Sequence, residues 1–71
     1  MTNYPPHLLR MIAEADELAV RIKAACEFLA SAHSWNLLDE TDRVLLSEQH
    51  HAMSHYHTLL TVRIEREKAK V

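Results

Sequence analysis

The chain contains no glycine, and its only two prolines stand side by side at Pro5 and Pro6. Tight β-hairpin turns rely heavily on glycine, so this composition favours an all-α fold. Proline is excluded from the interior of a helix but suits its first turn, which places the start of a first helix near Pro6. Because neither residue type occurs later, we expect long helices in the remainder of the chain.

Apolar residues recur at spacings of three and four through the first half of the chain, a pattern typical of a helix that packs against another helix. This seam consists of Leu8, Met11, Ala15, Leu18, Ile22, Ala25 and Leu29, and Ile12, Ala19 and Cys26 widen it on one side. We predict a first helix over residues 6–32, a loop over 33–38 and a second helix over 39–68. Asp39 is predicted to cap the start of the second helix.

The most informative part of the second predicted helix is the stretch from residue 45 to residue 64. One apolar face is predicted for Leu45, Leu46, Ala52, Met53, Leu59 and Leu60. Inside this face Gln49, Tyr56 and Arg63 are spaced by seven, so their side chains form one column. Buried polar groups are costly unless they are hydrogen-bonded, so each needs a partner. The first half of the chain, another subunit and a ligand remain three possible partners.

Seventy-one residues form at most one small domain, which is expected to need additional stabilisation. Cys26 is the only cysteine, so no intramolecular disulfide is possible, and we expect its side chain to act as a small buried hydrophobic group. Two helices form one layer and leave part of each apolar stripe exposed. We therefore predict an antiparallel two-helix hairpin that assembles into a homo-oligomeric helical bundle.

The charge and hydropathy of the chain exclude several classes of partner. A net charge of −2 argues against a general binder of DNA or RNA polymers, which would carry a basic patch. No apolar run is long enough to span a bilayer, and no secretory leader is recognisable. We therefore expect no membrane partner and a cytoplasmic location.

Six histidines are many for a chain of this length: His7, His33, His50, His51, His55 and His57. His51 and His55 are four residues apart on one helix, so both could bind one metal ion. The glutamate of an HExxH motif is missing, and a third ligand would have to come from elsewhere. We expect a solvated or interfacial histidine cluster, with no metal and no cofactor.

The sequence contains no recognisable catalytic set. Its serines lack a nucleophile elbow, and without glycine there is no glycine-rich phosphate loop. We therefore expect a protein that is not an enzyme. The column of Gln49, Tyr56 and Arg63 has two interpretations. It is either a hydrogen-bonded seam between helices or subunits, or part of a pocket for a planar anionic ligand, which tyrosine stacks against and arginine binds with forked donors.

The pattern resembles a family of very small phage-encoded helical proteins that includes the anti-CBASS sponges. The resemblance covers about Arg10 to Ile64, and its most specific part is the block Gln49-x₃-Met53-x₂-Tyr56-x₃-Leu60-x₂-Arg63-Ile64. Other positions that contribute are Arg10, Glu14, Glu17, Leu18, Ile22, Phe28, Leu29, Leu38, Asp39, Leu45 and Leu46.

This resemblance implies a non-enzymatic protein of the bacterial host cytoplasm that sequesters the cyclic oligonucleotide messengers of an anti-phage system. It implies a dimer-based oligomer of hairpins, a homodimer or hexamer, that binds cyclic dinucleotides between protomers through aromatic and basic side chains near the first helix. Separate pockets can take cyclic trinucleotides. The candidate ligand-binding residues in this chain are Tyr4, Arg21, Lys23, Tyr56 and Arg63. An oligomeric adaptor that docks on a host or phage protein is the alternative.

Overall fold

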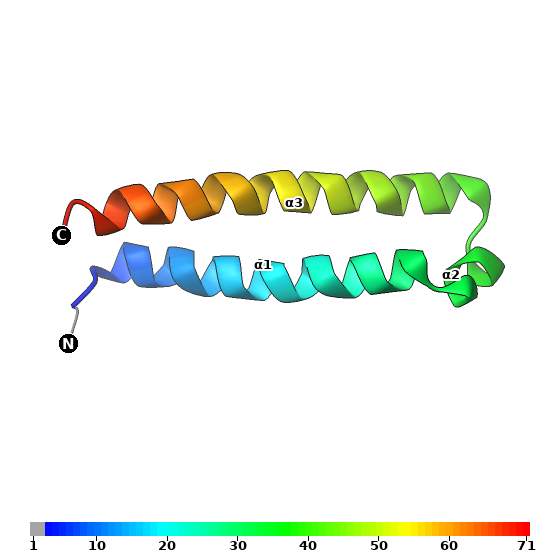
Figure 1. Cartoon of the computed structure of the whole chain (residues 1–71), viewed down its shortest axis with the longest axis horizontal. Coiled ribbons are helices and arrows are strands. Elements are labelled where there is room, and N and C mark those ends of the chain that lie inside the picture. Colours follow the sequence, from blue (N-terminus) through cyan, green and yellow to red (C-terminus); the bar gives the residue numbers. More distant parts are fainter. Residues whose placement is uncertain (1–2) are drawn as a thin grey trace.

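The computed structural model is a helical hairpin in which two long helices lie side by side and run in opposite directions (Figure 1). It describes residues 3–71, apart from the side chains of residues 33–35. The helices are α1 (Pro6–Ala30), α2 (Ala32–Leu37) and α3 (Glu40–Lys68). Figure 1 places both chain ends at one end of the hairpin and the short α2 at the other. The predicted all-α hairpin is therefore confirmed at the level of the single chain.

The starts of the two long helices follow the signals in the sequence. Pro6 is the first residue of α1, as predicted from the proline pair. At the start of α3 the Asp39 carboxylate accepts a hydrogen bond from the backbone N–H of Asp42 at 2.8 Å, which confirms the predicted cap. Glu40 and Asp42 place acidic side chains in the first turn, where they interact favourably with the helix dipole.

The connector differs from the prediction, because α2 is helical where a loop was expected over residues 33–38. The first helix also ends at Ala30, before the predicted residue 32. Ser31 has an extended backbone, and its hydroxyl donates a hydrogen bond to the carbonyl of Phe28 at 2.9 Å. The connector has serine and asparagine but no glycine or proline, so nothing prevents its backbone from returning to a helical conformation after Ser31.

The hydrophobic core lies toward the end of the hairpin that carries both termini. Its cluster contains Leu8 at 0% exposure, Leu60 at 1%, Ala15 and Ile64, with Tyr4, Met11 and Ile12 packed against them. Every residue of the predicted α1 seam is buried or half-buried. Full burial of one leucine side chain contributes roughly 1.5–3 kcal/mol, so Leu8 and Leu60 are major contributors to the stability of the hairpin.

The predicted single apolar face of α3 is wrong, because its residues divide into two rows. Leu46, Met53 and Leu60 are buried or half-buried against α1, whereas Leu45 and Leu59 are 61% and 50% exposed. One residue step rotates a side chain by about 100° around a helix, so neighbouring leucines cannot share one narrow face. The row that is turned away from α1 consists of Leu45, Ala52 and Leu59, called here the outer leucine row.

Toward α2 the interface between the two long helices becomes more polar. The half-buried positions of α3 there are Arg43, Leu46, Ser47, His50, Met53, Ser54 and His57. Cys26 of α1 is exposed, so the prediction that it is a buried hydrophobic residue is wrong. Over the described residues, no helix combines the length and the hydropathy that crossing a bilayer requires.

Candidate ligand-binding face

A hydrogen bond between Tyr56 and Glu14 connects the two long helices near their middle. The phenol Oη of Tyr56 on α3 donates to Oε1 of Glu14 on α1 at 2.5 Å. Both residues are exposed, and 42% of Tyr56 remains accessible to solvent. The first half of the chain is therefore the partner of Tyr56, among the three possibilities that the sequence left open. The bond holds the tyrosine ring at the surface of the hairpin.

This environment changes the acidity of Tyr56. The hydrogen bond to Glu14 raises the pKa of the Tyr56 phenol above its usual value, and desolvation and the negative charge of Glu14 act in the same direction. The positive charge of Arg63 opposes them by lowering the pKa of Tyr56. The phenol therefore stays neutral at physiological pH and remains a hydrogen-bond donor. Arg63 is also close enough to act on it electrostatically.

Gln49, Tyr56 and Arg63 lie along one exposed side of α3 and do not form a buried column. The prediction that they are buried among apolar residues is thus wrong for the single chain, because the row that faces α1 is the adjacent one. Arg21 follows Glu14 by seven residues and so lies on the same side of α1. We call the exposed surface formed by Glu14, Arg21, Gln49, Tyr56 and Arg63 the Tyr56 face.

The other two predicted binding residues lie away from the Tyr56 face. Lys23 is exposed, but two residue steps rotate it by about 200° from Arg21, which places it on the opposite side of α1. Tyr4 lies near the chain ends, where its half-buried ring packs against the core. The Lys68 ammonium lies 5.9 Å from the centre of the Tyr4 ring, a weak cation–π contact. Tyr56, Arg63 and Arg21 are therefore the predicted residues that share one side of the hairpin.

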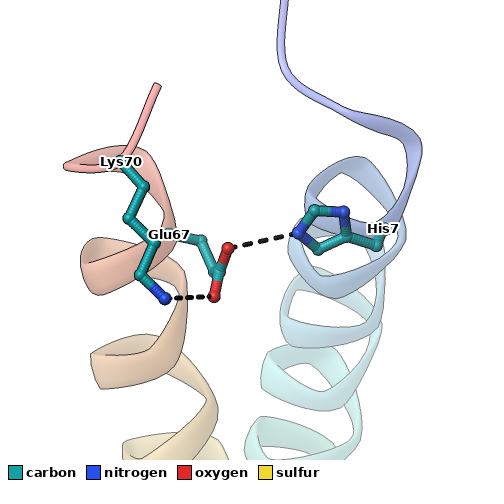
Figure 2. Close-up of polar contacts among 3 residues, drawn as sticks. All are labelled: His7, Glu67 and Lys70. Atoms are coloured by element: carbon teal, nitrogen blue, oxygen red, sulfur yellow. Dashed lines mark hydrogen bonds and ion pairs between the residues drawn. The ribbon is translucent and has the colours of Figure 1, made fainter.

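A second polar cluster joins the two ends of the chain, and Figure 2 shows its three side chains. The Nε2 atom of His7 lies 3.2 Å from Oε2 of Glu67, and the Lys70 ammonium lies 3.1 Å from Oε1 of the same carboxylate. The hydrogen bond to His7, followed by that to Lys70, lowers the pKa of Glu67 below its usual value. We call these residues the terminal clamp, because they connect the start of α1 to the end of α3.

Sequence reasoning did not identify the terminal clamp, although a signal for it was present. In an antiparallel hairpin the first residues of one helix lie opposite the last residues of the other. His7 and Glu67 are near those two ends, and they carry complementary groups. The pairing of Tyr56 with Glu14 follows the same rule. Matching polar residues across the hairpin in this way would have found both contacts.

The remaining histidines divide between two environments. His50 and His57 are half-buried on α3, whereas His51 and His55 are exposed. The rings of His50 and His51 meet edge to face, with centres 6.0 Å apart. Within the described residues, no group of three or more histidine, cysteine or acidic side chains is arranged to hold a metal ion. The side chain of His33 lies outside the described part.

Comparison with known families gives a match over residues 5–66 to the family described as Sequestin. The chain belongs to the Sequestin family. The matched range contains α1, α2 and most of α3, together with every residue of the Tyr56 face. Membership in Sequestin confirms the family resemblance predicted from the sequence. No curated protein and no solved structure matches the chain.

Proposed function

We propose that this member of the Sequestin family is a non-enzymatic protein that binds and sequesters cyclic di- or trinucleotide messengers. In this role it acts as an anti-CBASS sponge in the cytoplasm of a bacterial host and helps a phage to evade host immunity. The observation that carries the proposal is the exposed pair Tyr56 and Arg63 on one side of α3, within a chain of the Sequestin family. The family name itself denotes sequestration.

The side chains of this pair suit the chemistry of a cyclic nucleotide. An exposed tyrosine ring provides a surface on which a nucleobase stacks, and stacking is worth about 1–3 kcal/mol per base. A guanidinium provides planar, forked donors that match a phosphate. Arg63 is two helical turns from Tyr56, and its charge acts on the tyrosine phenol. One ligand with a base and a phosphate can therefore use both side chains.

The outer leucine row supports a site that is shared between copies of the chain. Leu59 follows Tyr56 by three residues and precedes Arg63 by four, so the row borders the Tyr56 face along α3. A two-fold interface through this row presents Tyr56 and Arg63 twice, which matches the near two-fold symmetry and double negative charge of a cyclic dinucleotide. We propose a homodimer, or a hexamer built from such dimers, as the binding unit.

Ligand binding is tested by titrating the protein with a panel of cyclic di- and trinucleotides while recording its thermal unfolding. A ligand at about one hundred times its Kd should stabilise the folded state by roughly 2.7 kcal/mol. Arg63→Ala should weaken binding but leave helicity unchanged. Lys23→Ala is the matched control, because it removes one exposed positive charge on the other side of the hairpin. Unaltered thermal unfolding with every ligand would contradict the proposal.

An adaptor function is the second candidate, and the exposed apolar side chains of α3 are the observation that favours it. Four apolar residues of α3 are each at least 50% exposed: Val44, Leu45, Leu59 and Val62. A partner helix from a host or phage protein could cover such residues. Under this alternative no cyclic nucleotide stabilises the protein. Substitution of these exposed apolar residues then abolishes partner binding without affecting any nucleotide titration.

A further inference from the structure

Glu14 brings a carboxylate to the edge of the proposed stacking surface. Its Oε1 atom accepts the hydrogen bond from the Tyr56 phenol at 2.5 Å, so the carboxylate is held beside the tyrosine ring. The Glu14 side chain is exposed, and a carboxylate has a second oxygen with its own lone pairs. A base that stacks on Tyr56 therefore meets a hydrogen-bond acceptor at its edge.

The Tyr56 face also carries opposite charges at different positions along the helix axes. Glu14 is negative and contacts Tyr56, whereas Arg63 is positive and lies about 10 Å farther along α3 at 1.5 Å per residue. Arg21 is also positive and lies about 10 Å from Glu14 along α1, so phosphates are attracted to Arg63 and Arg21 and repelled by Glu14. The ligand is expected to lie with a phosphate toward one of these arginines and a base edge toward Glu14.

An ionised carboxylate only accepts hydrogen bonds, so it selects a base edge that carries donors. Guanine presents two adjacent donors, N1–H and the N2 amino group, and both can bind one carboxylate. The corresponding edge of adenine places the N1 acceptor beside its amino donor, so one atom of adenine repels the carboxylate. Edge recognition of this kind is how proteins distinguish exposed bases.

We infer that Glu14 makes the Tyr56 face selective for guanine-containing cyclic nucleotides over those that contain only adenine. This inference rests on the proposed sequestration of cyclic nucleotides and adds the base preference of the same site. Glu14 acts here as a specificity-determining residue, and its hydrogen bond to Tyr56 keeps the carboxylate at the edge of the stacked base.

Calorimetric titration with cyclic di-GMP, cyclic di-AMP and cyclic GMP–AMP tests the inference. A well-formed two-donor contact discriminates against the wrong base by roughly tenfold to a hundredfold in affinity. We expect cyclic di-GMP to bind tighter than cyclic di-AMP by at least about tenfold. Glu14→Gln should remove most of this preference, because the amide presents one donor and one acceptor. The glutamine carbonyl still accepts from Tyr56, so the variant preserves the contact between the helices.

Glu27→Gln is the matched control, because it removes one exposed carboxylate from α1 at a position about 220° of rotation from Glu14, on the other side of the helix and outside the Tyr56 face. This variant should retain the preference of the unaltered protein. Equal affinity for cyclic di-GMP and cyclic di-AMP, or a preference that survives in Glu14→Gln, overturns the inference while leaving sequestration intact. Failure of all three ligands to bind overturns the inference together with the proposed function on which it rests.

Discussion

The phenol of Tyr56 donates a hydrogen bond to the carboxylate of Glu14 across the interface between α3 and α1. These residues are 42 positions apart in the sequence, so the contact exists only when the hairpin is closed. It fixes a tyrosine ring that would otherwise sample several rotamers at the surface. An aromatic side chain that is already ordered loses less entropy when a ligand stacks on it. The contact therefore links the closure of the hairpin to the proposed binding site.

The acidity of Tyr56 reports this contact directly. In Tyr4→Phe, which leaves one tyrosine in the chain, the phenol should ionise above its ordinary pKa of 10.0 because Glu14 raises the pKa. Adding Glu14→Ala should return the pKa toward that value, as followed by ultraviolet titration of the phenolate. Adding Glu17→Ala should leave it raised. An identical pKa with and without Glu14 would show that the two side chains do not interact in solution.

This raised pKa also determines a dependence of stability on pH. The folded state holds the Tyr56 proton more tightly than the unfolded state, so the contribution to stability is fully present below pH 10. It is lost as the pH rises through the higher pKa of the folded state. Thermal unfolding of Tyr4→Phe at a series of alkaline pH values, with and without Glu14→Ala, measures this effect.

The terminal clamp predicts a dependence on pH at the acidic end of the range. Contacts with His7 and Lys70 lower the pKa of Glu67 in the folded state below the usual 4.5. Its contribution to stability is therefore present above pH 4.5 and is lost as the pH falls through the lowered pKa. Glu67→Gln should reduce the loss of melting temperature on acidification. Glu48→Gln removes an exposed carboxylate elsewhere on α3. This variant should lose as much melting temperature on acidification as the unaltered protein.

Two adjacent leucines of α1 test the position of the core. Leu8 is completely buried, whereas its neighbour Leu9 is 53% exposed. Leu8→Ala should lower the free energy of unfolding by about 2–5 kcal/mol through lost burial and a cavity. Leu9→Ala should change it by about 0.5 kcal/mol or less, as expected of a surface position. Urea denaturation of both variants measures the difference. Similar losses for the two would place the core on a different face of α1.

The outer leucine row predicts where copies of the chain meet. Leu59→Glu places a charge in this row, and burial of an unpaired charge is strongly unfavourable. The variant should therefore shift the protein toward a smaller species in sedimentation velocity, with unchanged helicity. Val20→Glu introduces the same charge at an exposed position of α1 and should leave the assembly size unaltered. A wild-type protein that sediments as a monomer at micromolar concentration would refute the proposed shared site.

The sequence predicted the starts of the two long helices well, because they depend on local chemistry. Pro6 and the carboxylate of Asp39 act on backbone groups within one turn, so their effects can be derived without the rest of the fold. The α1 seam was also predictable, since one unbroken series of spacings defines one face. The short α2 was missed because polar composition alone does not distinguish a loop from a single helical turn or two.

The orientation of α3 about its axis was harder to predict. Leu45 and Leu46 are adjacent, and periodicity alone does not decide which of them faces α1. The structure buries the Leu46 side, and this choice exposes both Leu59 and the Tyr56 face. Contacts between the helices decide which leucine faces α1, and the hydrogen bond between Tyr56 and Glu14 is one of these contacts. The separation of Lys23 from Arg21 then follows from the helical rotation between them.

We propose that the chain captures cyclic oligonucleotides and does not alter them. The most direct measurement is to incubate the purified protein with each cyclic nucleotide, remove unbound ligand, denature the complex and analyse the released compound by chromatography. We expect a cyclic nucleotide to be retained in stoichiometric amount and recovered intact, and Arg63→Ala to retain far less. Recovery of a linear product, or no retention of any cyclic nucleotide, would contradict this proposal.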